Sequence, residues 1–199
     1  MYIPCSKSWK DIFVTESSLI DPQPGYPCDK PGDIMYDNHI KALELALSDS
    51  FQISPSTALD IHRVLTRGIG FLEDYNASGQ YRIMDVTVGG DTCPPSYLLK
   101  ELMDNVWYPT TKRLIDRVID GDFTAIQAAW ISHHIFEIIH PFLDGNGRTG
   151  RIILNKVMND CGADPLIIYF EDRFIYYDSI EKFRKEHFDG KKFINLQNF

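Results

Sequence analysis

The sequence predicts a mainly helical domain that carries one small β-hairpin. Along most of the 199 residues, apolar side chains recur at the 3.6-residue spacing of helices that bury one face. One stretch differs, because residues 82–88 are rich in strand-forming residues and are followed by Gly89-Gly90. A proline-rich stretch near the N-terminus interrupts regular structure.

That stretch, residues 21–32, contains four prolines and two glycines and divides the chain. A helix is expected before it, over 8–20. We therefore expect an N-terminal segment, 1–32, followed by the main domain, 33–199.

The first helices of the main domain are predicted from their capping signals. Asp37 can cap one helix, and Ser54-Pro55 opens the next, which would stop at Gly68. Two further helices are expected, one around 99–106 that ends near Pro109 and one over 114–118.

The second half of the domain contains the most apolar helix, over 128–138, which we expect at the buried centre. Another helix should run from Arg148 to Gly162, and the last should carry Tyr176, Ile180 and Phe183. Residues 166–170 have the composition of a second strand.

Composition excludes several classes of protein. Lys and Arg number 20 against 28 Asp and Glu, so the net charge of -8 argues against a nucleic-acid partner. Four scattered cysteines fit a reducing compartment. Neither a signal peptide nor an apolar run of roughly 18–20 residues is visible, so we expect no membrane contact and a cytoplasmic location. An effector secreted without a signal would have the same composition.

Polar residues are densest between His140 and Arg151, at the junction of two predicted helices. Gly145 and Gly147 allow backbone N–H groups to converge on an anion, and the following helix adds its positive end. Arg148 and Arg151 lie three residues apart, so both guanidinium groups reach the same side. This pattern predicts a polyphosphate site.

Two further residues supply chemistry to that site. Asp144 offers a hard oxygen ligand for Mg²⁺, and His140 offers a base whose pKa lies near neutral pH. Together these groups predict a phosphate-ester transfer reaction.

The segment resembles the signature of the Fic family, H-P-F-x-(D/E)-G-N-G-R-x-x-R, at every specified position. The resemblance extends from about His62 to about Tyr177 and implies a Fic-type helical bundle. It also implies a protein adenylyltransferase that uses ATP and Mg²⁺ to transfer AMP to a Ser, Thr or Tyr hydroxyl of a target protein, including itself. The implied roles are base for His140, Mg²⁺ ligand for Asp144, and phosphate binding for Gly145, Asn146, Gly147, Arg148 and Arg151.

Some relatives transfer UMP, phosphate or phosphocholine, or remove AMP, so these reactions stay open. The kinase-like relatives carry a lysine where this chain has Gly147, which favours nucleotidyl transfer. A degenerate, non-catalytic nucleotide-binding module is the alternative of another class, although the histidine and arginines that such modules lose are present.

The predicted hairpin resembles the flap of the family, which positions the target. Its residues here would be Val86, Thr87, Val88 and Gly89, and strand addition along an exposed edge would capture a target segment. A purely structural hairpin is the alternative.

Ser17 to Pro22 resembles the inhibitory motif of the family, (S/T)-x-x-x-E-(G/N), in which the glutamate pairs with the second arginine. Here Asp21 stands in place of that glutamate, with Ser17 at the start. Because Asp is one methylene shorter, we expect autoinhibition to be weakened unless Asp21 lies closer. The alternative is an ordinary helix end.

Two more features of the family map onto the chain. Tyr176 and Tyr177 resemble the tyrosine pair that lines the adenine pocket, although Arg184 replaces an asparagine found in those relatives. A homodimer is also compatible with the resemblance.

Other sequence patterns give weaker evidence for a dinucleotide or metal site. Gly145-x-Gly147-x-x-Gly150 matches a dinucleotide fingerprint, but no strand precedes it. Glu137-x-x-His140 is only half of a di-iron motif, and His133 with His140 lacks zinc partners. His39, His62 and His187 show no constellation and are expected to be structural or exposed.

Overall fold

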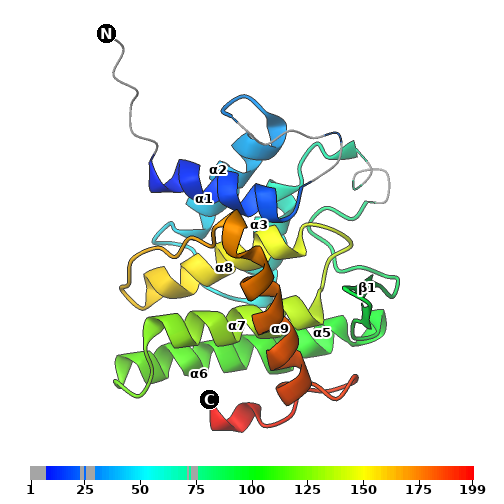
Figure 1. Ribbon diagram of the computed structural model, residues 1–199, viewed down its shortest axis with the longest axis vertical. Coiled ribbons are helices and arrows are strands. Elements are labelled where there is room, and N and C mark those ends of the chain that lie inside the picture. Colours follow the sequence, from blue (N-terminus) through cyan, green and yellow to red (C-terminus); the bar gives the residue numbers. More distant parts are fainter. Residues whose placement is uncertain (1–7, 23–24, 26–29, 71, 73–75) are drawn as a thin grey trace.

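The computed structural model describes residues 8–22, 25, 30–70, 72 and 76–199. Its helices form stacked layers, with α1 and α2 at one end, α8 in the middle and α6 and α7 at the other end (Figure 1). The predicted mainly helical fold with a small hairpin is confirmed. No helix among the described residues is long and apolar enough to cross a membrane.

The N-terminal helix α1 (Trp9–Ile20) begins at a capping box formed by Ser8 and Asp11. It buries Phe13 and Val14 in the main core and packs on α2 and α8. Half of the predicted proline-rich stretch, together with Cys5 and Cys28, lies outside the described residues. The thiols of Cys93 and Cys161 are free.

Helices α2 (Ile34–Ala46) and α3 (Pro55–Leu65) pack against each other. The prediction that Asp37 caps α2 is wrong, because the helix begins three residues earlier and Asp37 accepts a hydrogen bond from the Gly32 N–H. Ser54 caps α3 as predicted, and the helix ends at Leu65, before Gly68.

A continuous helical rod replaces the two helices predicted around Pro109. Helix α5 (Leu99–Leu102), a π-helical turn (Met103–Trp107) and α6 (Tyr108–Ile119) follow one another without a break. The prediction that Pro109 ends a helix is therefore wrong. Proline lacks an N–H, and it lies here in the first turn after the π-helical segment, where that donor is not needed.

Helix α7 (Ala125–Ile139) is the buried central helix, as predicted, and contacts α6, α8 and α9. Helix α8 (Asn146–Asp160) starts slightly before the expected Arg148, and α9 (Arg173–His187) carries the predicted apolar face. The strand predicted over 166–170 is absent, because the Asn155 side chain takes both backbone hydrogen bonds of Leu166.

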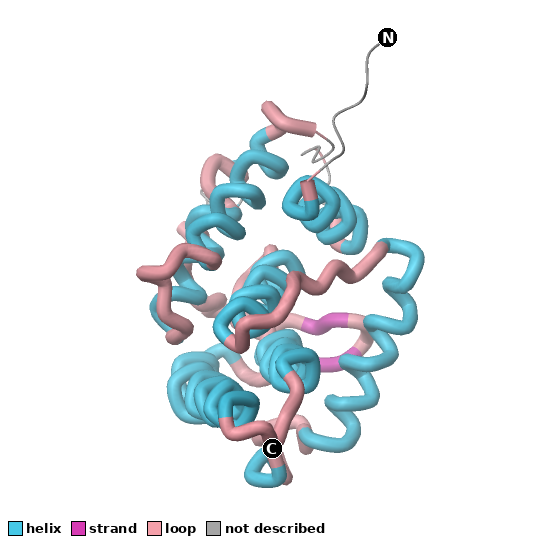
Figure 2. The backbone as a smooth tube through the Cα atoms, turned by 90° about the vertical axis from the view of Figure 1, so that its left-hand side faces the viewer, coloured by secondary structure: helices cyan, strands magenta, loops and turns pink. Residues whose placement is uncertain are grey.

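The hairpin pairs β1 (Thr87–Val88) with β2 (Asp91–Thr92) in antiparallel register across Gly89 and Gly90, both at positive φ. Figure 2 shows these two strands beside helices that are seen nearly end-on. The strand is shorter than the predicted 82–88 because Arg82 is bound elsewhere, its N–H donating to the Pro141 carbonyl.

Candidate active site

A cavity of about 480 Å³ opens where α1 ends, α7 ends and α8 begins, with α9 and the hairpin at its sides. It collects most of the residues that the sequence predicted for the site. They are Asp21, Val88, Gly89, His140, Asp144, Gly145, Asn146, Gly147, Arg148, Tyr176 and Tyr177. Arg151 donates to both Ser17 and Asp21, whereas Val86 and Thr87 lie just before and at the start of β1 and do not line the cavity.

His140 stands directly after α7, in the left-handed conformation with φ of 50°. That conformation is uncommon for a residue with a side chain and turns the chain sharply into the loop. Burial lowers the pKa of His140 to about 4, opposed by a ring hydrogen bond to the backbone of Glu137 and assisted by the charge of Arg82. The imidazole is therefore neutral at physiological pH and able to accept a proton.

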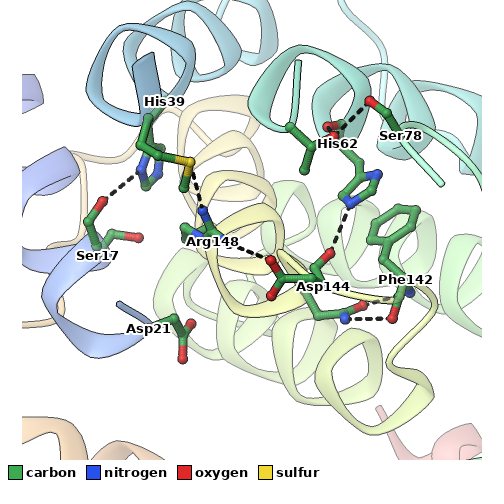
Figure 3. Close-up of polar contacts among 12 residues, drawn as sticks. Ser17, Asp21, His39, His62, Ser78, Phe142, Asp144 and Arg148 are labelled. Atoms are coloured by element: carbon green, nitrogen blue, oxygen red, sulfur yellow. Dashed lines mark hydrogen bonds and ion pairs between the residues drawn. The ribbon is translucent and has the colours of Figure 1, made fainter. Parts of the chain in front are cut away.

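The loop after His140 is fixed by side chains that bond to its backbone (Figure 3). The Asn146 amide accepts from the Phe142 N–H at 2.8 Å and donates to the Phe142 carbonyl at 2.9 Å. The Asn146 side chain thus closes the loop, and only its backbone N–H remains for an anion.

A second set of hydrogen bonds to the backbone of this loop comes from α3. His62 Nδ1 accepts from the Gly79 N–H at 2.9 Å, so Nε2 carries the proton and donates to the Asp144 carbonyl at 2.9 Å. Its ring stacks on Phe142 with centroids 3.8 Å apart. His62 is fully buried, and burial lowers its pKa to about 4.

The start of α8 is suited to bind an anion. Gly145 is the N-cap with φ of 77°, and no described side chain caps the helix there. The first N–H groups of a helix have no partner within the helix, and its dipole adds partial positive charge. The N-terminus therefore points unused donors at the cavity.

Arg148 and Arg151 are both almost fully buried, with exposed fractions of 2% and 1%. Arg148 donates to Asp144 Oδ2 at 3.1 Å, so the proposed metal ligand and the first arginine form a pair. Asp144 keeps 32% of its side chain exposed and lines the cavity.

Arg151 is bound to the end of α1. Its Nη2 donates to Asp21 Oδ2 at 2.7 Å and to the Ser17 carbonyl at 2.8 Å, and its Nε donates to Ser17 Oγ at 2.9 Å. The shorter Asp21 side chain reaches Arg151 because the last turn of α1 brings its backbone close, which is the condition under which the sequence left autoinhibition open. A Cβ built on Gly147 would lie 2.0 Å from Asp21 Oδ2, so the carboxylate lies against the first turn of α8, where the sequence predicts phosphate binding.

The two tyrosines differ in surroundings. Tyr176 is buried, and its hydroxyl contacts Arg151 Nη1 at 3.3 Å and His133 Nε2 at 3.0 Å. Tyr177 is 40% exposed and donates to the Ile20 carbonyl at 3.0 Å. Both tyrosines line the cavity. Tyr176 also contacts Arg151, which binds the end of α1, and Tyr177 contacts α1 directly.

Glu137 also lines this cavity, although the sequence singled it out only as half of a di-iron motif. It is 8% exposed, and its Oε1 has no hydrogen-bond partner among the described residues. Burial raises the pKa of Glu137 to about 8, with Arg151 opposing and Asp21 adding to the shift. Among the described residues, no group of three or more His, Cys, Asp or Glu is arranged to hold a metal ion.

The model of the Fic/DOC family matches residues 52–158, just over half of the chain. The chain belongs to the Fic/DOC family. The matched range contains the loop, both arginines and the hairpin described above. A fragment of Fic-1 from C. elegans has the same fold with a TM-score of 0.60 at 25% identity, covering 86% of this chain and 54% of that structure.

Further relatives share the Fic fold or sequence. A Fic domain containing signaling protein from Bacteroides thetaiotaomicron superposes with a TM-score of 0.64 at 21% identity, over 77% of this chain and 58% of that one. "Protein adenylyltransferase fic-1" of Caenorhabditis elegans is 37% identical over 131 residues, and "Protein adenylyltransferase Fic" of Nematostella vectensis is 33% identical over 177. These alignments cover 65% and 83% of this chain but only 24% and 38% of the relatives.

Proposed function

We propose that the chain is a protein adenylyltransferase that moves AMP from ATP to a hydroxyl of a protein target. The target oxygen bonds to the α-phosphorus of ATP, the bond to pyrophosphate breaks, and His140 takes the hydroxyl proton. The observation that carries the proposal is the cavity that brings neutral His140 to the uncapped start of α8 beside Arg148. Relatives named as protein adenylyltransferases support it.

The phosphates of ATP would bind at the start of α8. Backbone N–H groups of Gly145, Asn146 and Gly147 supply neutral donors, and Arg148 supplies a charge-assisted pair. Tyr176 and Tyr177 would line the adenine end, on the α9 side of the same cavity.

Mg²⁺ fits this donor set. The ion usually takes one or two carboxylates and completes its shell with phosphate oxygens and water. Asp144 is a partly exposed carboxylate at the cavity wall, one turn before Arg148. It would hold the ion that neutralises the phosphate charge when ATP is bound.

The protein target would lie along the hairpin. Thr87 and Val88 are exposed on β1, and Val88 and Gly89 reach the cavity, so a strand added there would run toward His140. Val86 contributes its carbonyl to the base of the hairpin by accepting from the Cys93 N–H. A cytoplasmic location and a homodimer remain predictions from the sequence and its resemblance.

We also propose that α1 inhibits the enzyme through Asp21. The three guanidinium nitrogens of Arg151 all donate within the protein, to Ser17, Asp21 and Tyr176. A γ-phosphate can bind Arg151 only when Asp21 leaves. Burial alone would lower the pKa of Arg151, but Asp21 and Tyr176 hold the pKa above its ordinary value, so the pair is favourable.

Mass spectrometry of the intact protein after incubation with ATP and Mg²⁺ tests the activity. We expect a mass gain equal to AMP, and label from α-labelled but not γ-labelled ATP. His140→Ala should lose the transfer while retaining ATP binding. Label from the γ-position alone would indicate phosphate transfer, modification by UTP alone would indicate UMP transfer, and binding without modification would indicate a non-catalytic module.

A further inference from the structure

Arg82 is a buried cation that joins the hairpin to the end of α7. Its side chain has no exposed surface, and its guanidinium donates to backbone carbonyls instead of a carboxylate. Nε donates to the His140 carbonyl at 2.9 Å, Nη1 to the Met84 carbonyl at 2.8 Å, and Nη2 to the Pro94 carbonyl at 2.7 Å. The planar fork of arginine matches this arrangement, which a lysine ammonium cannot reproduce.

These carbonyls belong to two separate parts of the site. Met84 and Pro94 flank the hairpin on its two sides, whereas His140 is the proposed base. The carboxylate of Asp85 is 3.9 Å away and 62% exposed, so carbonyl dipoles provide most of the compensation for the charge. The end of α7 adds the negative end of its helix dipole.

The same residue stabilises the unusual backbone of His140. A non-glycine residue in the left-handed region is strained and persists where its surroundings hold it. Here the Arg82 N–H donates to the Pro141 carbonyl at 2.9 Å, while its side chain holds the His140 carbonyl. Both peptide groups after α7 are therefore fixed from one residue.

We propose that Arg82 is a positioning residue that keeps the target-binding hairpin and the base His140 in one fixed relation. A target segment on the hairpin would then present its hydroxyl to the imidazole without further adjustment. This inference rests on the proposed function. Arg82 is not part of the cavity lining that the described residues form, so it should affect transfer and leave nucleotide binding almost unchanged.

Arg82→Lys tests the fork, because it keeps the charge and the backbone N–H but loses the three-carbonyl geometry. Arg113→Lys is the control for the loss of an arginine fork, since Arg113 is exposed and donates to the backbone oxygens of Leu196 and Phe199, away from the cavity lining. Each variant would be made alone and in combination with Asp21→Gly. Each would be compared with the protein that has the same residue at position 21.

We expect Arg82→Lys to slow AMP transfer at least tenfold while the Kd of a fluorescent ATP analogue changes less than twofold. Hydrogen–deuterium exchange should rise together in residues 84–94 and 139–142, and not in α3. Arg113→Lys should change none of these. Arg82→Gln, which also removes the charge, should in addition raise the pKa of His140, whose ring is faced by Glu137, Asp21, Arg82 and Arg184.

Three results would overturn the proposal. The first is AMP transfer at the parental rate in Arg82→Lys. The second is an equal loss of nucleotide binding and AMP transfer in that variant. The third is faster hydrogen–deuterium exchange in the hairpin alone. A variant that fails to fold also counts against it, because Arg82 would then act in folding stability. If the parent protein transfers no AMP, the proposed function fails, and the exchange measurement still decides whether Arg82 couples the two segments.

Discussion

His140 combines a strained backbone with a neutral ring, and both follow from its place at the end of a buried helix. Its predicted role as a base requires the deprotonated imidazole. An ordinary histidine has a pKa of about 6.5 and would lose that form in mildly acidic solution. Burial instead lowers the pKa of His140 to about 4, so the base stays available well below neutral pH.

NMR titration of the histidine ring protons can check this value. The His140 signal, assigned by its loss in His140→Ala, should reach half-protonation near pH 4, and about nine-tenths of the rings should be neutral at pH 5. Because the shift favours the neutral form, protonation should begin only as pH falls below about 5. A midpoint near 6.5 would show that the ring is solvated and contradict the buried geometry.

His62 is the residue whose role sequence reasoning missed, since it carries no recognisable spacing to the motif. Its Nε2–H holds the Asp144 carbonyl, while Nδ1 holds the Gly79 N–H. Residues that orient a metal ligand typically contribute 10–100-fold to metal affinity or activity. His62 therefore supports the loop from behind rather than touching a substrate.

Two substitutions separate the hydrogen bonds of His62. His62→Gln can place an amide N–H near the position of Nε2, whereas His62→Asn can keep only the shorter bond to Gly79. We expect His62→Asn to raise the Mg²⁺ concentration needed for tight binding of a fluorescent ATP analogue by about tenfold. His62→Gln should stay within a few fold of the parent protein. Equal effects of both variants would indicate a purely structural histidine.

At the scale of elements, the last turn of α1 is held to the rest of the molecule by polar contacts. Besides the Asp21–Arg151 pair, Ser18 contacts His39 at 3.3 Å, and Tyr177 donates to the Ile20 carbonyl. Such contacts can be exchanged for contacts to a nucleotide, whereas the buried Phe13 and Val14 keep the helix attached. The helix can therefore release Asp21 without leaving the fold.

Asp21→Gly should increase auto-modification by about tenfold or more, because it frees Arg151 for the γ-phosphate and removes a buried charge-assisted bond. Asp21→Glu, which keeps a carboxylate, should remain close to the parent protein. Incorporation of α-labelled ATP measures both. An unchanged rate in Asp21→Gly would show that the contact does not inhibit.

The crossing of α7 and α8 explains a glycine that motif reading left ambiguous. Gly150 completes a dinucleotide-like pattern, but its surroundings are those of a helix contact. A Cβ on Gly150 would lie 2.1 Å from Glu137 Oε1 and 3.0 Å from the His133 ring. Close approach of the two helices therefore requires glycine there, and α7 and α8 make extensive contact.

For the whole molecule, buried ionisable groups dictate how stability varies with pH. Burial lowers the pKa values of His39, His62, His133, His134 and His140, so unfolding takes up protons as pH falls through the ordinary value near 6.5. Their contribution to stability is present above pH 6.5 and is lost toward pH 4. Glu137 acts in the opposite direction, since its pKa is raised to about 8 in the folded state. Its contribution is present below pH 4.5 and is lost as pH rises toward 8.

Stability should therefore be greatest near pH 7, where the protons taken up by the five histidines on unfolding balance the one proton released by Glu137. Thermal unfolding should show a Tm lower by roughly 10 °C or more at pH 4.5 than at pH 6.5. Glu137→Gln should reduce the decline between pH 7 and 8 and steepen the rise between pH 4.5 and 7, because the Glu137 contribution is lost over that whole range. A flat profile in the parent protein would contradict the burial of these groups.

The sequence by itself determined the helical class, the buried central helix and the polar loop that we propose binds phosphate. These are local properties, because a 3.6-residue period, a cap such as Ser54 and a run from His140 to Arg151 each act over a few turns of chain. The hairpin was also predictable, since Gly89-Gly90 permits only a narrow set of turns. The helix boundaries predicted at Asp37 and Pro109 are wrong because each residue type is compatible with more than one position in a helix. Asp37 lies in the first turn of α2 and Pro109 in the first turn of α6.

Only the tertiary structure decided that Asp21 reaches Arg151, that Arg82 joins the hairpin to His140, and that His62 holds the loop. Each of these contacts joins residues 58 to 130 positions apart. Side-chain reach alone cannot predict such contacts, because helix packing sets the backbone separations. A shorter carboxylate suffices where the backbone has already come close.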